Sequence, residues 1–372
     1  ALVDCHGSQC GFCTPGFAMS LYASYERHQG AGTRPTRQQL ADDLSGNLCR
    51  CTGYRPILDA GQALFEAPAA RLDPEPLAAL LRQIAERTTE PFVHTAPNPA
   101  YPDARGHPRI DHFIAPRTLE TFAAVRAERP EARLLAGATD IGLWTNKQLR
   151  DVGDLLYLGD VRELHAVEHD GPQLRIGAAV PLDDAWAALV QHWPELREMA
   201  LRFAGPPVRH AGTLGGNVAN GSPIGDSAPV LLALDAVLLL QRGSALRRLP
   251  LAEFYLDYMK NALQPGEFLR AIELPLPTPS ETPQQALRLR AYKLSKRYDC
   301  DISAVSCGLA LRFAAQGHVS HARLAFGGMA AVVKRAAQAE AALLGQPWSE
   351  ASVRAAMQAL GADFQPLTDL RA

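Results

Sequence analysis

The spacing of hydrophobic and polar positions changes along the chain and separates it into regions of different predicted structure. Residues 1–66 follow a helical pattern, in which Thr14 and Pro15 provide an N-cap and a first helical position. Thr36 and Gln39 have the spacing of a capping box, which predicts the start of a second helix. We therefore expect a small helical bundle at the start of the chain.

Residues 67–108 are rich in proline, alanine and charged residues. The repeated prolines between residues 95 and 108 prevent regular helix or sheet, which predicts an extended linker. One helix is expected within it, at 76–87.

The rest of the chain mixes short apolar runs with helical stretches. From 109 to 285, β-branched or leucine-rich runs alternate with helical patterns, which predicts an α/β or α+β region in two lobes. From 286 to 372, the pattern is typical of an antiparallel meander followed by helices at 333–345 and 349–361. The chain is therefore predicted to be a multidomain α+β protein.

Composition adds limits on size, charge and location. A length of 372 residues is typical of two or three domains, and the net charge of −2 leaves no basic surface for nucleic acid or anionic lipid. No apolar run is long enough to span a membrane and the first residues do not form a signal peptide, so we expect a cytoplasmic protein. Because the chain starts at Ala1 and reaches a cysteine motif at once, we expect a truncated or proteolysed start.

Four of the cysteines form two tight pairs near the start of the chain. The segment HGSQCGFCTPGF separates Cys10 from Cys13 by two residues, and GNLCRCTGY separates Cys49 from Cys51 by one. The total of seven cysteines is odd and most lie at one end, which argues against a disulfide framework and for metal binding or redox chemistry.

Three interpretations of these pairs remain open. An iron–sulfur cluster needs thiolates near backbone N–H groups, which a pair before each of two helices would supply. Zinc also binds four cysteines, but structural zinc sites usually space both pairs by two to four residues. Four ordinary buried thiols have no reason to pair twice beside glycines. The spacing favours a redox cluster over zinc, and zinc over buried thiols.

Two glycine-rich segments predict a phosphate-binding site. They are LLAGATDIG at 134–142 and HAGTLGGNVANGSPIGD at 210–226. Glycines allow successive backbone amides to converge on a phosphate, and Thr and Asn side chains add neutral donors. Neither segment matches the Rossmann or P-loop fingerprint. Tight turns alone would explain the glycines of either segment, but this explanation is weaker for two such segments in one region.

The cysteine segments closely resemble the second [2Fe–2S] domain of the molybdenum hydroxylases, the family of the xanthine dehydrogenases and aldehyde oxidases. The resemblance implies a four-helix domain that holds the cluster nearest to the molybdenum cofactor, with Cys10, Cys13, Cys49 and Cys51 as ligands. Family members carry a plant-type [2Fe–2S] domain ahead of this one, which is not in this sequence. The remaining cysteines are expected to be packing residues: Cys5, Cys300 and Cys307.

The glycine-rich segments resemble the FAD-binding segments of the same family. Its flavin domain has a two-lobed, vanillyl-alcohol-oxidase-like fold and not a Rossmann fold. The resemblance implies that the first segment lines the adenosine and pyrophosphate through Leu134, Leu135, Ala136, Gly137, Ala138, Thr139 and Asp140. It implies that the second segment holds the phosphate and ribitol through Thr213, Gly215, Gly216 and Asn217. Asp226 would bind the sugar chain of the flavin.

Further positions match family residues near the flavin ring. Phe203 corresponds to an aromatic residue at the isoalloxazine ring, Leu269 to an apolar ring contact and Lys293 to a lysine near the flavin. Without the resemblance, Phe203 is a core residue and Lys293 a solvated charge on a strand. Asp299 lies in a segment that resembles a loop bearing on nicotinamide access. One departure is the Pro206–Pro207 pair, which removes two amide donors near the expected ring edge.

The resemblance implies the iron–sulfur and flavin subunit of a xanthine dehydrogenase-type enzyme. A [2Fe–2S] domain at 1–66, a linker at 67–108, an FAD domain at 109–285 and a C-terminal α+β domain with an antiparallel sheet at 286–372 would make up the chain. Electrons would pass from a molybdenum centre on a molybdopterin-binding large subunit through [2Fe–2S] to FAD and then to NAD⁺. The family likeness also implies a dimer of heterodimers, with no nucleic acid or membrane partner.

Two alternatives share these residues. A molybdenum hydroxylase acting on an aldehyde or N-heterocycle would have the same features, because its selectivity lies in the other subunit. A zinc-stabilised assembly module with a vestigial nucleotide pocket would use the same cysteines without redox activity. The choice between NAD⁺ and oxygen as acceptor is also open, although a separate small subunit favours NAD⁺.

Overall fold

The computed structural model describes residues 1–86, 90–277, 286–298, 300–366 and 368. The chain divides into two compact units, one formed by residues 1–89 with 205–207 and the other by 90–204 with 208–372. No helix in the described ranges is both long enough and apolar enough to cross a membrane.

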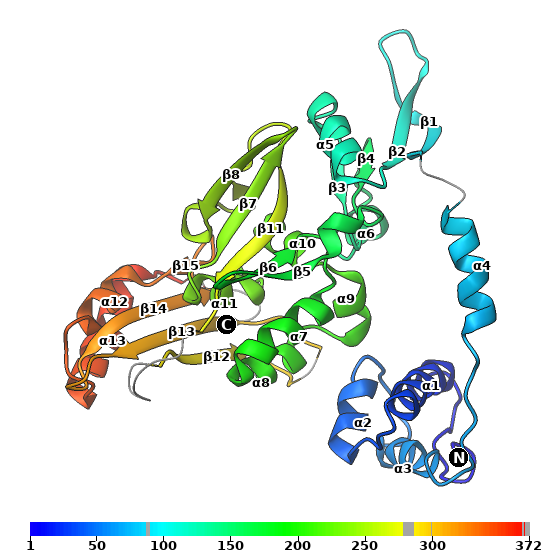
Figure 1. The fold of residues 1–372 in the computed structure, drawn as a ribbon, viewed down its shortest axis with the longest axis horizontal. Helices are drawn as coiled ribbons and strands as arrows, with labels where there is room; N and C mark the ends of the chain where they lie inside the picture. The colour runs from blue at the N-terminus through cyan, green and yellow to red at the C-terminus, as the bar shows by residue number, and fades with distance from the viewer. Residues whose placement is uncertain (87–89, 278–285, 299, 367, 369–372) are drawn as a thin grey trace. The chain divides into compact units, whose positions relative to one another are not determined.

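The first unit is helical (Figure 1). Its helices are α1 (Thr14–Gly30), α2 (Arg37–Leu44), α3 (Arg55–Ala63) and α4 (Glu75–Glu86). The first three helices surround a small apolar core that is built from Phe17, Leu21, Leu40, Leu44, Cys49 and Ile57.

Helix starts in this unit follow the predicted signals with one exception. The capping box of Thr36 and Gln39 is confirmed, with both reciprocal hydrogen bonds present. Helix α1 begins at Thr14 with Cys13 as its N-cap, one residue earlier than predicted. Residues 1–66 hold three of the four helices that the structure describes in this unit, and the fourth, α4, lies in the stretch predicted as a linker. Helix α4 follows close to the predicted 76–87.

The second unit begins with a four-stranded sheet in the order β1-β2-β4-β3. Its strands are β1 (Phe92–Pro102), β2 (Pro108–Ala115), β3 (Arg133–Leu135) and β4 (Leu155–Tyr157). The β1–β2 pair is antiparallel, whereas β4 lies parallel to both β2 and β3. Helix α5 (Leu119–Glu128) packs on this sheet through the fully buried Phe122.

The prediction that prolines prevent regular structure up to residue 108 is wrong. Strand β1 contains Pro97, Pro99 and Pro102 and still pairs with β2. The reason is its position, because β1 is the edge strand of the sheet and one side of its backbone needs no hydrogen-bond partner in the sheet. Proline lacks an N–H, so it is tolerated where that group would face away from the neighbouring strand.

A second, antiparallel sheet carries the largest core in the order β5-β6-β11-β7-β8. Its strands are β5 (Val167–Asp170), β6 (Gln173–Gly177), β7 (Val237–Arg242), β8 (Ala245–Pro250) and β11 (Phe268–Pro275). A separate hairpin consists of β9 (Tyr255–Asp257) and β10 (Lys260–Asn261).

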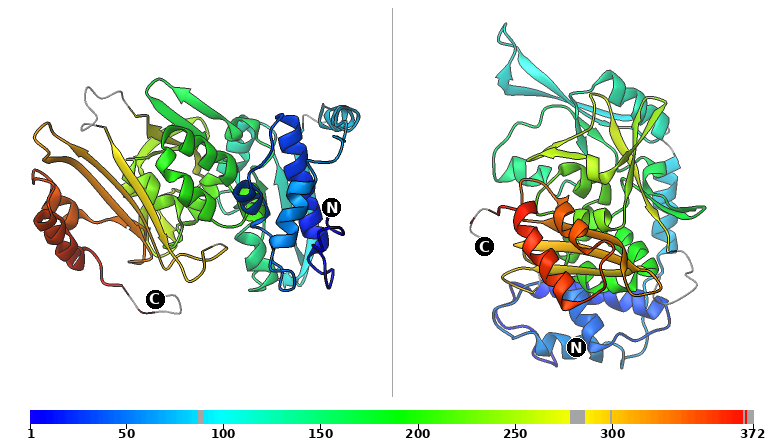
Figure 2. Two further views of the ribbon diagram at one scale, coloured as in Figure 1. Left: turned by 90° about the horizontal axis from the view of Figure 1, so that it is seen from below. Right: turned by 90° about the vertical axis from the view of Figure 1, so that its left-hand side faces the viewer.

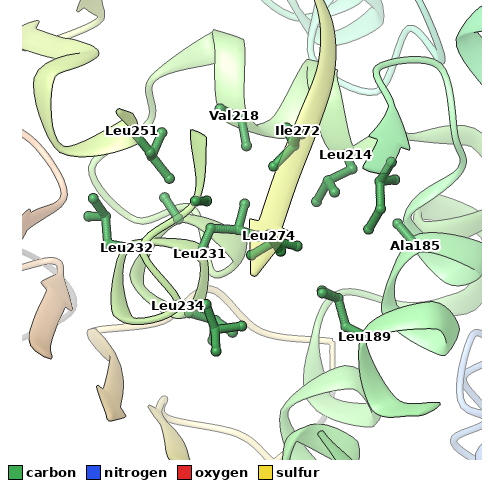
Figure 3. Close-up of a cluster of buried hydrophobic side chains, with 14 of the residues drawn as sticks. Ala185, Leu189, Leu214, Val218, Leu231, Leu232, Leu234, Leu251, Ile272 and Leu274 are labelled. Carbon is green, nitrogen blue, oxygen red and sulfur yellow. The ribbon is translucent and has the colours of Figure 1, made fainter. Parts of the chain in front are cut away.

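Short helices lie between and against the sheets. They are α6 (Ile141–Asn146), α7 (Leu182–His192), α8 (Arg197–Arg202), α9 (Pro206–Ala211), α10 (Leu214–Asn220) and α11 (Ser227–Ala233), with 3₁₀ turns η1 (Arg162–His165), η2 (Pro194–Leu196) and η3 (Leu251–Glu253). Figure 3 shows side chains of α7, α10, α11 and β11 meeting in the core. The core therefore anchors the helix that follows the second glycine-rich segment.

A third, antiparallel sheet lies near the C-terminal end of the chain in the order β12-β13-β14-β15. Its strands are β12 (Arg288–Leu294), β13 (Val305–Phe313), β14 (Val319–Gly327) and β15 (Lys334–Arg335). Helices α12 (Ala337–Leu343) and α13 (Glu350–Asp363) pack on this sheet (Figure 2). The helix predicted at 333–345 is thus shorter than expected, because residues 334 and 335 extend the sheet.

Candidate iron–sulfur and flavin sites

The four paired cysteines come together in the first unit. Cys10 lies in the loop before α1, Cys13 is the N-cap of α1, and Cys49 and Cys51 lie between α2 and α3. The Sγ atoms of Cys10 and Cys51 are 3.6 Å apart, and the thiol of Cys13 interacts with that of Cys49. Each cysteine of the first motif therefore meets one of the second.

Backbone conformation at two glycines allows the thiols to meet. Gly11, between Cys10 and Cys13, has a φ of 83°, and Gly53, two residues after Cys51, has a φ of 67°. Both values lie in the left-handed region, which glycine adopts without the steric cost of a Cβ. The amide of Cys49 donates to the Tyr54 hydroxyl at 3.1 Å, which ties the second motif to the start of α3.

Hydrogen bonds to sulfur favour the thiolate form at Cys49 and Cys10, whereas the pKa of Cys13 is raised by burial and that of Cys51 by its hydrogen bond with Cys10. The hydroxyl of Thr52, followed by the amides of Thr52 and Cys51, lowers the pKa of the Cys49 thiol to about 6. The amide of Phe12 lowers the pKa of Cys10. Since iron and zinc both bind thiolate and not thiol, these donors prepare the site for a metal.

The grouping of the thiols in pairs fits a cluster with two metal ions. A [2Fe–2S] cluster takes four cysteine ligands, two at each iron, and the pairs Cys10–Cys51 and Cys13–Cys49 match that division. The other cysteines with a described burial are Cys5, Cys300 and Cys307, of which only Cys307 is fully buried.

The structure brings the two glycine-rich segments into contact. A Cβ on Gly137 would lie 1.6 Å from the carbonyl oxygen of Ala211, so a side chain cannot fit there. A Cβ on Gly212 would lie 3.3 Å from the hydroxyl of Thr139. The first segment, after β3, therefore packs directly on the start of the second. The predicted residues Leu134 to Asp140 run from the end of β3 to the N-cap of α6, and Thr213 to Asn217 form the N-cap and first turn of α10, so the two sets lie on neighbouring segments.

Most backbone amides of the second segment already have partners within the protein. Thr213 is the N-cap of α10, and its hydroxyl accepts from the amide of Gly216 at 3.0 Å. The amide of Gly215 donates to the carbonyl of Ala178 at 3.1 Å, and a Cβ on Gly215 would lie 2.5 Å from that oxygen. Gly215 therefore serves close packing of α10, and its amide is not available to a phosphate.

Asn217 provides the polar atom of this segment that lacks a partner. Within the described part of the chain, its Oδ1 is buried and accepts no hydrogen bond. A buried acceptor without a donor is costly unless a ligand or water supplies one. The hydroxyl groups of a ribityl chain are donors of the required kind, so Asn217 fits an FAD site.

Asp226 and Lys293 form a buried ion pair between the start of α11 and β12. The Nζ of Lys293 donates to Oδ2 of Asp226 at 2.7 Å, and the hydroxyl of Ser303 donates to Oδ1 at 2.5 Å. Asp226 is 4% exposed and Lys293 6%, so the expectation of a solvated lysine on a strand is wrong. Sequence reasoning missed Ser303, because it lies far from Asp226 in the chain and no motif marks it.

Phe203 and Leu269 lie in the main core. Phe203 packs against Trp186 with ring centroids 5.8 Å apart, and Leu269 is a buried residue of β11. The buried Arg209 donates to the carbonyls of Phe203 and Ala204 at 3.0 and 3.1 Å and fixes the chain just before α9. The predicted contacts of both side chains with a flavin ring remain predictions. Asp299 lies outside the described residues.

The proline pair has a structural explanation. Pro206 and Pro207 are the first two residues of α9. Amide groups in the first turn of a helix have no acceptor within the helix, so the missing N–H groups cost nothing there. The departure from the family pattern is thus compatible with the fold of this segment.

Comparison with protein-family models assigns three domains along the chain. Residues 1–62 match a [2Fe-2S] binding domain, residues 108–277 an FAD binding domain in molybdopterin dehydrogenase, and residues 290–372 a CO dehydrogenase flavoprotein C-terminal domain. The first match contains all four paired cysteines. The second contains both glycine-rich segments and Asp226, and the third contains Lys293 and Ser303.

Individual proteins agree with these domain assignments. Xanthine dehydrogenase from Emericella nidulans is 32% identical over 96% of this chain, and nicotinate hydroxylase from the same organism is 27% identical over 98%. The chain spans only 29% and 33% of the lengths of these two relatives. The crystal structure of carbon monoxide dehydrogenase from Hydrogenophaga pseudoflava has 28% identity and a TM-score of 0.63, over 69% of this chain and 88% of the matched chain. The chain therefore carries the iron–sulfur and flavin domains of the molybdenum hydroxylase family.

Proposed function

We propose that this chain is the electron-transfer subunit of a xanthine dehydrogenase. The observation that carries the proposal is that two sites lie in one polypeptide. The four paired cysteines form the first site, in the first unit. The buried pair of Asp226 and Lys293, together with the two contacting glycine-rich segments, forms the second site, in the second unit. An iron–sulfur site and a flavin site on the same chain would allow electrons to pass from the cluster to the flavin. The likeness to a xanthine dehydrogenase over nearly the whole chain supports the choice of enzyme.

The cysteine site would hold a [2Fe–2S] cluster through Cys10, Cys13, Cys49 and Cys51. Thr52 and the neighbouring amides stabilise negative charge on Cys49, which favours ligand thiolate and tunes the potential of a bound cluster. When bound, the cluster exchanges single electrons and FAD exchanges electron pairs with NAD⁺.

The flavin site would be formed by the contacting glycine-rich segments together with Asn217 and Asp226. Asn217 Oδ1 would accept from a flavin hydroxyl. Lys293 and Ser303 each bind one oxygen of Asp226, so the carboxylate is held in one orientation toward its ligand. The Nζ of Lys293 lies 2.7 Å from Asp226, so the two buried groups balance each other's charge.

The molybdenum centre and its pterin would lie on a partner subunit, and we propose NAD⁺ as the final acceptor. We also propose a dimer of heterodimers in the cytoplasm.

A second candidate is the corresponding subunit of a hydroxylase for an N-heterocycle. The specific observation is the likeness to nicotinate hydroxylase, at 27% identity over 98% of the chain. The residues described above would act in the same way in both enzymes, because substrate choice lies with the molybdenum subunit.

Purification of the native complex tests these proposals. We expect flavin and iron–sulfur absorption from the purified chain, a co-purifying molybdopterin subunit, and reduction of NAD⁺ with xanthine. Turnover of nicotinate or quinoline without turnover of xanthine would favour the second candidate. Reduction of oxygen with no reduction of NAD⁺ would show that oxygen, and not NAD⁺, is the final electron acceptor. A colourless chain with bound zinc would favour an assembly module and overturn both enzyme proposals.

A further inference from the structure

Two histidines from different elements meet at the rim of the main core. His169 belongs to β5 and His192 is the last residue of α7. Their Nε2 atoms are 3.1 Å apart, and their rings are nearly perpendicular, with centroids 5.1 Å apart. This pair involves none of the residues predicted to hold a cofactor.

The elements that carry the two histidines are anchored in the core, although the His169 side chain itself is exposed. His169 lies opposite the fully buried Leu174 in the β5–β6 ladder, and residues directly opposite in a sheet share a face. On α7, Leu189 is fully buried one turn before His192, and the buried Trp193 follows it. The ring of His192 also packs edge-on against Trp193, with centroids 5.9 Å apart. The imidazoles are thus placed by elements that the core fixes.

The separation of the two nitrogen atoms matches that of two ligands on one metal ion. Metal–nitrogen bonds of histidine are about 2.0–2.1 Å long, which places two such nitrogens about 2.9 Å apart at a right angle and about 3.3 Å apart at a tetrahedral angle. The observed 3.1 Å lies between these values. Imidazole is a preferred ligand of zinc, nickel and copper.

We propose that His169 and His192 form a binding site for a divalent transition-metal ion such as Ni²⁺ or Zn²⁺. Both Nε2 lone pairs bind the metal, and water molecules complete its coordination. In the metal-free pair one ring donates its Nε2 proton to the other. On metal binding that proton moves to Nδ1 of the same ring, so both rings stay neutral and no proton is lost. The bound ion would tie the edge strand β5 to the end of α7.

Titration of the full chain, purified with its cofactors, with Ni²⁺ tests this site by calorimetry. We expect one equivalent of Ni²⁺ whose affinity falls at least about tenfold in His169→Gln and in His192→Gln, since even losses outside the ligand shell cost this much. The matched control is His94→Asn, an exposed histidine on β1, which should bind as the unaltered chain does. Any Ni²⁺ bound by cysteines appears equally in all variants and does not affect the comparison.

Thermal unfolding gives a second measurement of the same site. Because a ligand that binds only the folded state stabilises it, Ni²⁺ should raise the unfolding midpoint of the unaltered chain and of His94→Asn. It should raise the midpoints of the two pair variants less than those of the unaltered chain and of His94→Asn. If the calorimetric equivalent keeps its affinity in both pair variants, or if the unaltered chain binds no such equivalent, the proposed site is overturned. Neither result bears on the proposed electron-transfer function.

Discussion

The cysteine site is partly exposed to solvent, whereas the Asp226 site is buried. Cys10 and Cys51 are exposed, and the loops that carry them are joined by few hydrogen bonds besides those to sulfur. Asp226 and Lys293 are buried, and both carboxylate oxygens of Asp226 have partners. The first site consists of thiols that a bound metal would hold in place, whereas the polar groups of the second are held by one another. Substitutions at the two sites should therefore differ in kind.

The largest effect is expected at the cysteine site and concerns the cofactor. Replacing Cys49 by Ser removes the thiol whose pKa the neighbouring donors lower most, and the variant should lose its entire iron–sulfur cluster. Iron analysis and the visible spectrum measure this loss. Cys5→Ser is the matched control, because Cys5 belongs to neither pair, and it should keep the full iron content. Retention of iron by Cys49→Ser would show that the assigned ligand set is wrong.

At the Asp226 site the main effect should be on folding. Lys293→Met leaves the Asp226 carboxylate buried without its counter-charge, which should lower the free energy of unfolding by about 3–5 kcal/mol. Urea denaturation followed by circular dichroism measures the change. Adding Asp226→Asn to this variant removes the remaining charge and should recover part of the stability. A double variant that is no more stable than Lys293→Met would argue against the buried, unpaired Asp226 carboxylate as the cause of the lower stability.

Contact between the glycine-rich segments can be tested at one position. Gly137→Ala places a Cβ 1.6 Å from the carbonyl oxygen of Ala211, so the two segments must move apart. We expect a loss of about 1–3 kcal/mol in the free energy of unfolding and weaker retention of flavin. Gly142→Ala is the control, because a Cβ there meets nothing within 4 Å and alanine favours the helix. Equal flavin content in the two variants would show that the contact does not shape the site.

Sequence reasoning succeeded where the signal is local. The capping box of Thr36 and Gln39 and the position of Cys13 directly before α1 depend on residues a few positions apart, and spacing alone identifies them. It failed where the deciding contact is distant in the chain. Proline suppresses a strand unless the strand lies at an edge, and only the sheet order shows that β1 does.

The candidate flavin site illustrates the same limit. The glycine-rich segments could be identified from composition. Composition does not show which of their backbone amides already donate hydrogen bonds to other groups of the protein. Gly215 illustrates this, because its amide is taken by Ala178 from another part of the chain. Ser303 could not be predicted at all, since its role arises from a hydrogen bond to Asp226, 77 residues earlier in the chain.

The smallest expected effect concerns Thr213, the N-cap of α10. Substitutions there distinguish a role in helix stability from a role in cofactor binding. Thr213→Ala removes the hydroxyl that accepts from the amide of Gly216, and should cost about 1 kcal/mol of the free energy of unfolding. Thr213→Ser keeps the hydroxyl and should stay close to the unaltered chain. If Thr213 acts only as a cap, the loss in the free energy of flavin binding should not exceed the loss in the free energy of unfolding. A much larger loss of flavin in Thr213→Ala than in Lys293→Met would instead show that the Thr213 hydroxyl contacts the cofactor. The flavin site would then depend on its cofactor for order, as the cysteine site would depend on its metal, and the difference between the two sites would be smaller than proposed.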